Sequence, residues 1–91
     1  MNDTNAQREM PKYKCHKVVH ALKINSIRLD LNADHGIIFP EEPGFGSFQV
    51  ENSYFQKHNP HPGGYFVVYE DGYKSFSPAE AFESGYTLIE E

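Results

Sequence analysis

The chain has 91 residues, which is enough for a single domain. Its formal net charge of −5 is uneven: residues 1–28 carry +4 and residues 29–91 carry −9, with Lys57 and Lys74 as the only lysine or arginine residues in the longer segment. A general nucleic-acid-binding domain usually has a basic face over its whole surface. Nucleic acid is therefore not expected as a partner.

Cysteine usage and hydropathy bear on the cellular setting. Cys15 is the only cysteine, so neither an internal disulfide nor a cysteine-based zinc site can form. Residues 1–11 are polar and predict a disordered leader before one domain over residues 12–91. No secretory signal and no run of about 20 apolar residues is present, so a cytoplasmic location without membrane contact is expected.

The first predicted element is a strand over residues 16–24, where apolar and polar residues alternate. A helix over residues 17–24 is the alternative. The apolar phase moves from even to odd positions after Ile24, which predicts a bulge or break near Asn25–Ser26. Residues 32–36 have the composition of a turn, and residues 37–39 predict a short strand that ends at Pro40 and completes a hairpin.

The middle of the chain predicts a third strand and a short helix. Residues 45–50 form the strand, with Phe48 and Val50 on one face. Asn52 is expected to cap a helix over residues 53–58 that turns Tyr54 and Phe55 inward.

The strongest strand signal covers residues 65–70, and Asp71-Gly72 predicts a two-residue type I′ turn into a returning strand over residues 73–76. That turn would place Tyr69 opposite Lys74. Both faces of this hairpin carry apolar residues, so a central position with cover on two sides is expected.

The last elements are a helix and a strand. Ser77 is expected as the N-cap of the helix, with Pro78 at its first position and Glu80 completing a capping box. Gly85 is expected to end the helix in the left-handed conformation, before a final strand over residues 86–89. The predicted fold class is α+β, a small twisted antiparallel sheet of about five strands with one or two short helices.

Residues 63–82, which read GGYFVVYEDGYKSFSPAEAF and are followed by Gly85-Tyr86-Thr87, resemble the C-terminal half of small uncharacterised bacteriophage and prophage proteins. Residues 17–24 look like the opening strand of those proteins. The resemblance implies that the chain shares the fold of those phage proteins, for which no activity is known. The pattern of elements from residue 65 onward is also similar to a phage anti-defence family that sequesters a cyclic nucleotide, but this chain lacks the tryptophans of that family. No ligand residue is carried over.

Several residue pairs have the composition of a chemical site. On the predicted strand His16 and His20 would lie about 13 Å apart, too far for one metal ion, whereas on a helix they would be one turn apart and could chelate a metal. His58 and His61 are two ligands where zinc needs three or four. Cys15 and His16 point to opposite faces of a strand, and the acid pairs Glu41-Glu42 and Glu70-Asp71 are explained by a solvated loop and a turn. The sequence predicts no catalytic residue, metal or cofactor, and hence no enzyme.

The tyrosines exceed what a core of this size needs, and Tyr is enriched at protein interfaces. A non-enzymatic phage accessory protein that binds a host or viral protein is therefore the first functional hypothesis, and self-association is compatible with it. The alternative is an oligomeric protein that sequesters an anionic, nucleotide-like signal through cations gathered around one concavity. The candidate partner surface comprises Tyr65, Tyr69, Tyr73, Phe45 and Phe48, and the candidate anion site comprises Lys17, Lys23 and Arg28.

Overall fold

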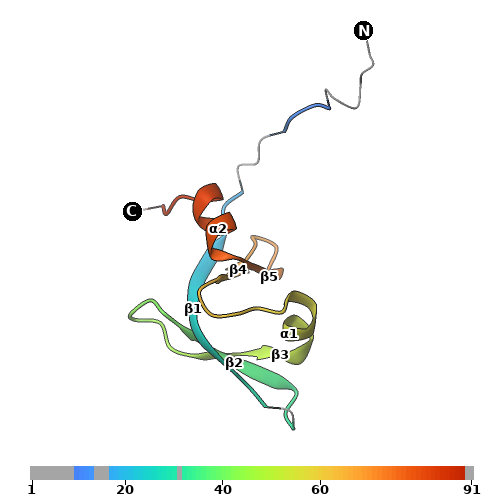
Figure 1. Ribbon diagram of the computed structural model, residues 1–91, viewed down its shortest axis with the longest axis vertical. Helices are drawn as coiled ribbons and strands as arrows, with labels where there is room; N and C mark the ends of the chain where they lie inside the picture. The colour runs from blue at the N-terminus through green and yellow to red at the C-terminus, as the bar shows by residue number, and fades with distance from the viewer. Residues whose placement is uncertain (1–9, 14–16, 31, 90–91) are drawn as a thin grey trace.

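A computed structural model describes residues 10–13, 17–30 and 32–89. It confirms the predicted fold class: five antiparallel strands form one open sheet in the order β3-β2-β1-β4-β5, accompanied by two short helices (Figure 1). Strands β1 to β3 follow one another, and β4 returns to lie beside β1, which is a Greek key. The elements are β1 (His20–Leu29), β2 (His35–Pro40), β3 (Phe48–Glu51), α1 (Asn52–His58), β4 (Tyr65–Val68), β5 (Lys74–Ser77) and α2 (Ala79–Gly85).

Strand β1 is the centre of the sheet and joins its two halves. Its first residues, from His20 to Lys23, pair with β4, and its later residues, from Ile24 to Leu29, pair with β2. The register shifts between Ile24 and Ser26, so the predicted bulge is confirmed at the place where β1 changes partner. A bulge bends a strand and increases its twist, and β1 runs as a long curved ribbon between the two halves (Figure 1).

The core lies inside the curved sheet and is closed on one side by α1. Ile24 and Ile38 are completely buried, and Tyr54 and Phe55 of α1 are buried beside them, as predicted. Aromatic residues therefore share the core with β-branched residues of β1 and β2. The core residues are Ile24, Ile38, Val50, Tyr54, Phe55 and Phe66, with Ile27, Phe48, Val68 and Phe76 packed against them.

The start of α1 differs from the prediction. Glu51 occupies the N-cap position and makes no capping hydrogen bond with its side chain. Asn52 is the first residue of the helix, and its side-chain amide donates a hydrogen bond of 2.8 Å to the carbonyl of Ala33. Asn52 therefore attaches α1 to the β1–β2 turn, and the predicted cap is wrong.

The β4–β5 hairpin has a three-residue loop in place of the predicted two-residue turn. Val68 pairs with Lys74, and Tyr69 faces Tyr73, so the register is shifted by one residue from the expected pairing. A type I′ turn needs positive φ at both central residues. Of Asp71 and Gly72, only Gly72 has a positive φ, of +90°. This pattern fits a type I turn followed by a glycine bulge.

The hairpin is also not central. Strand β5 is an outer strand of the sheet, and β1 holds the middle position. The reason is that β1 bends at its bulge and offers one edge to β2 and the other to β4.

Helix α2 begins within two residues of Ser77, but the predicted caps are wrong. Ser77 belongs to β5, and its hydroxyl bonds to the carbonyl of Pro78, which is the actual N-cap and makes no side-chain capping bond. Gly85 is the last helical residue and is not among the glycines with positive φ. Residues 86–89 form no strand, so the predicted final strand is wrong.

Some expectations lie outside the described residues, namely most of the 1–11 leader, Cys15 and His16. Among the residues that are described, no helix is both long enough and apolar enough to cross a lipid bilayer.

Candidate protein-binding site

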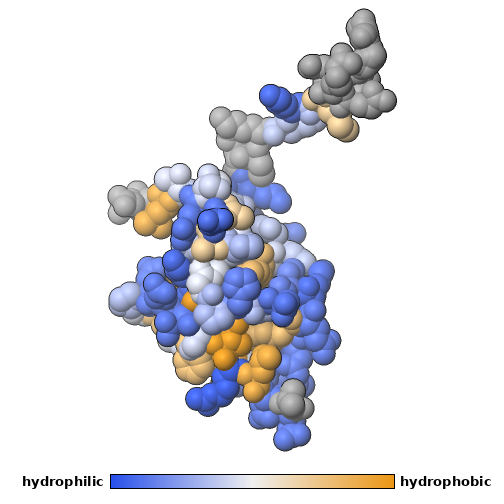
Figure 2. Space-filling view, viewed as in Figure 1, coloured by the Kyte–Doolittle hydropathy of each residue, from blue (hydrophilic) through white to orange (hydrophobic). Residues whose placement is uncertain are grey.

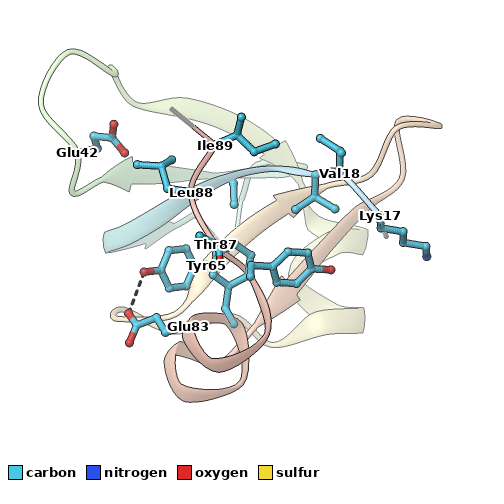
Figure 3. Close-up of a pocket in the computed structure, with 12 residues that line it drawn as sticks. Lys17, Val18, Glu42, Tyr65, Glu83, Thr87, Leu88 and Ile89 are labelled. Carbon is cyan, nitrogen blue, oxygen red and sulfur yellow. Dashed lines mark hydrogen bonds between the residues drawn. The ribbon is translucent and has the colours of Figure 1, made fainter. Parts of the chain in front are cut away.

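A groove with a volume of about 390 Å³ lies between β1, β4 and the C-terminal part of the chain. The segment leading into β1 contributes Lys17 and Val18, β4 contributes Tyr65, and the coil after α2 contributes Leu88 and Ile89. These residues come from both ends of the described chain and meet around one hollow (Figure 3). We call it the aromatic groove.

One wall of the aromatic groove is a row of three stacked rings. Tyr65 stacks on Phe82 with ring centroids 4.2 Å apart and planes 21° from parallel, and Phe82 stacks on Tyr86 at 4.6 Å and 18°. Phe82 and Tyr86 are four residues apart, the spacing that places side chains on one face of a helix. The row thus fixes α2 and its C-terminal cap against β4.

Glu83 joins this wall to β1. The Tyr65 hydroxyl donates a 2.8 Å hydrogen bond to Glu83 Oε2, and Lys23 Nζ lies 3.4 Å from the same oxygen (Figure 3 draws the first bond). The hydrogen bond from Tyr65, followed by the contact with Lys23, lowers the pKa of the Glu83 carboxyl. Desolvation and the bond to Glu83 raise the pKa of the Tyr65 hydroxyl. Glu83 is therefore held ionised and Tyr65 neutral, as a structural tie requires.

The opposite side of the groove exposes aliphatic side chains. Leu88 is 81% exposed, Ile89 62% and Val18 46%. Hydrophobic surface is visible on the C-terminal segment, beside a largely hydrophilic face (Figure 2). Clustered exposed apolar residues with a polar rim are typical of surfaces that bind protein.

The structure distributes the five predicted partner residues over several places. Only Tyr65 lies in the aromatic groove, while Tyr69 and Tyr73 stack on each other at the β4–β5 loop, with centroids 5.8 Å apart. Phe48 packs on Phe66 at 4.9 Å and belongs with the core, and Phe45 is 53% exposed in the β2–β3 loop.

The three cations of the predicted anion site each have a different neighbour. Lys17 lies over the ring of Tyr69 at 4.7 Å, Lys23 contacts Glu83, and Arg28 lies over Phe39 at 5.7 Å. Lys17 precedes β1, whereas Lys23 and Arg28 lie within it, and only Lys17 lines the aromatic groove.

His58 and His61, the pair of histidines in the second half of the chain, contact aromatic rings. His58 lies between Tyr54, at 4.9 Å, and Tyr73, at 5.9 Å, while His61 packs on Phe76 at 4.9 Å. In the ranges 10–13, 17–30 and 32–89, no group of three or more His, Cys, Asp or Glu residues could hold a metal ion.

Sequence reasoning missed most of the aromatic groove. The stack of Phe82 on Tyr86 could have been found from their spacing of four residues. Leu88 and Ile89 were assigned to a strand and so were not considered as surface, and Val18 gave no signal of meeting them.

The strand order, with α1 between β3 and β4, defines a class: a five-stranded, partly open Greek-key sheet of the OB-fold kind.

No protein-family model matches the chain, and no curated protein matches its sequence. The structure is similar to the NMR solution structure of the monomeric form of the phage L decoration protein, with a TM-score of 0.62 and 25% sequence identity. The match covers 96% of this chain and 65% of that one, so the chain spans about 65% of the decoration protein's length. Likeness to a phage protein is thus confirmed at the level of fold.

Proposed function

We propose that the chain is a non-catalytic phage accessory protein that binds a structural protein of a phage particle. The observation that carries the proposal is the likeness to the phage L decoration protein, which extends over nearly the whole chain.

The aromatic groove supports a binding role because it has the composition of a protein interface. Its three-ring wall is held rigid by stacking and by the tie to Glu83, so little side-chain freedom is lost when a partner docks. The aliphatic side chains of Leu88 and Ile89 stand open for contact. Tyr, which contributes two rings to this wall, is enriched among the residues that dominate binding at interfaces.

Glu83 in the same groove is poorly suited to act as a general acid. A general acid needs a carboxyl group whose pKa is raised toward the working pH. The bond from Tyr65 lowers the pKa of Glu83, which makes it a poorer proton donor. Glu83 is better suited to holding α2 in place than to transferring a proton.

Association with phage particles tests the proposal. Particles made by the genome that encodes the chain would be purified on a gradient and probed for the protein, and particles from a deletion strain would be mixed with purified protein and sedimented. Stoichiometric co-sedimentation in both experiments is expected. Protein that stays in the soluble fraction in both would refute the proposal.

Matched variants locate the binding face. Leu88→Ser and Phe45→Ser each remove one exposed apolar side chain, from the aromatic groove and from the β2–β3 loop respectively. We expect Leu88→Ser to weaken particle binding and Phe45→Ser to leave it unchanged. The reverse result would move the interface to the β2–β3 loop.

A further inference from the structure

A second groove lies on another part of the molecule, between the two outer strands of the sheet. Its volume is about 480 Å³, and its walls are β3, α1 and the start of β5 with the loop before it. Lys57 of α1 and Lys74 of β5 both line it. These are the only lysine or arginine residues of residues 29–91, a segment with a net charge of −9. We call it the β3–β5 groove.

Two exposed lysines supply positive charge to this groove. Within the part of the chain that the structure describes, neither lysine forms an ion pair with a carboxylate. Lys57 Nζ lies 5.0 Å from the centre of the Tyr73 ring, and the Tyr73 hydroxyl is 3.3 Å from His58 Nε2. The groove thus presents two ammonium groups beside an imidazole and a tyrosine.

One carboxylate, Glu51, also lines the groove. It accepts a hydrogen bond of 3.4 Å from the Ser53 hydroxyl beside the start of α1. With two lysines against one glutamate, the lining has an excess of positive charge on an otherwise acidic segment.

The backbone at the groove suits an extended peptide. Strands β3 and β5 end the sheet on either side, and an outer strand has backbone groups without a strand partner. The Tyr54 hydroxyl donates a 2.7 Å hydrogen bond to the Ser75 carbonyl and so holds α1 against β5 beside this edge. Peptides are commonly recognised by adding a strand to such an edge.

We propose that the β3–β5 groove binds a short, extended, acidic segment of a partner protein. The lysines would pair with its carboxylates, and the strand edge would bond to its backbone. A protein segment fits better than a small anion, because Lys57 and Lys74 are exposed side chains on separate elements and form no enclosed pocket.

This inference rests on the proposed function only in taking the occupant to be a protein. The β3–β5 groove shares no lining residue with the aromatic groove. Particle binding and peptide binding can therefore succeed or fail separately.

The test is a titration of the ¹⁵N-labelled full chain, followed by amide chemical shifts. The probe is a capped peptide of about eight residues that alternates Glu and Val, because alternation sends all carboxylates to one face of a strand. The control peptide replaces Glu by Gln. Peptide is added up to about 2 mM, which detects complexes as weak as millimolar.

The expected result is a set of shifts confined to β3, α1 and the start of β5, seen with the Glu peptide and absent with the Gln peptide. The response should shrink when salt is raised from about 20 mM to about 300 mM, since screening weakens exposed ion pairs. Lys57→Ala and Lys74→Ala should each weaken binding about two- to fivefold, as expected for loss of one exposed ion pair. Lys12→Ala removes the same charge outside the groove and should have no effect.

Four results would overturn the inference. They are no shifts at the highest concentration, equal shifts with the Gln peptide, shifts centred on β1, and equal loss of binding in the Lys12→Ala control. Two further titrations exclude other occupants. If inorganic phosphate shifts the same amide signals as strongly as the Glu peptide does, the groove is a small-anion site. If the shifts change with protein concentration in the absence of peptide, the groove binds a second copy of this chain.

Discussion

The hydrogen bond from Tyr54 to Ser75 joins α1 to an outer strand of the open sheet, and Tyr54→Phe removes it. The ring stays in the core, where Tyr54 is only 6% exposed, so no large cavity is created. The change deletes a 2.7 Å bond and leaves the Ser75 carbonyl without that partner.

The expected loss of stability follows from the lost hydrogen bond and from the carbonyl that it leaves without this partner. A typical intramolecular hydrogen bond contributes about 0.5–1.5 kcal/mol, and a buried group left unpaired costs about 1–3 kcal/mol. Because Ser75 is half-buried, water can replace part of the lost bond, and we expect a total of about 1–2 kcal/mol. For a domain of this size each kcal/mol moves the melting temperature by roughly 4–8 °C, which gives a decrease of roughly 4–16 °C.

The assay is thermal unfolding followed by circular dichroism at neutral pH. Tyr65→Phe is the matched control, because it removes a hydroxyl hydrogen bond of 2.8 Å to the exposed Glu83. Exposed interactions of this kind contribute little, so the control should melt within a few degrees of the parent. If Tyr65→Phe proves more damaging than Tyr54→Phe, the role assigned to the bond between α1 and β5 is wrong.

A pH series adds an independent check. Burial raises the pKa of the Tyr54 hydroxyl above its usual value of 10.0. A raised pKa contributes stability that is fully present below pH 10.0 and is lost as the pH rises through the folded-state pKa. The parent should therefore lose stability above pH 10 faster than Tyr54→Phe, and the gap between them should narrow. A gap that widens in alkali would contradict the buried, neutral hydroxyl.

Three further changes test other parts of the structure. Glu83→Gln should lower the melting temperature at pH 7 by no more than a few degrees, because the interactions of Glu83 are exposed. Since the bond from Tyr65 lowers the pKa of Glu83, this small difference should fade as the pH falls below 4.5, the ordinary value; a constant difference from pH 7 to pH 2 would count against that bond. Gly64→Ala should cost about 1–3 kcal/mol in denaturant unfolding, since overpacking strains a core and a Cβ at this position would collide with the ring of Phe76. Unchanged stability would contradict this close approach. Gly72→Val should cost about 1–3 kcal/mol because a β-branched residue resists positive φ. Gly46→Val is the control and should cost much less, because Gly46 lies in open space and has no positive φ. Equal melting temperatures for the two variants would refute the hairpin loop.

Local chemistry in the sequence determined several elements. The alternation along β1 and its change of phase after Ile24 located both the strand and its bulge, because side chains alternate across a strand and one extra residue reverses that alternation. The position of α2 followed from Ser77-Pro78, although neither predicted cap formed. Gly72 was identified as a turn residue from the Asp71-Gly72 pair. Its observed φ of +90° is one that few residues other than glycine accept.

Other features depended on contacts between distant residues. The β4–β5 register was mispredicted by one residue because Asp71-Gly72 is compatible with both a two-residue and a three-residue loop. The observed pairing sets Phe66 opposite Phe76, and the Asp71 carboxylate accepts a hydrogen bond from the amide of Tyr73.

The sequence by itself determined the fold class, most strand positions and the excess of acid after residue 28. Only the tertiary structure decided that β1 is central, that Leu88 and Ile89 meet Val18 in one groove, and that Lys57 and Lys74 line another. The physical reason is that periodicity and turn chemistry act over a few neighbouring residues, whereas both grooves are formed by elements far apart in the chain and brought together by the curvature of β1.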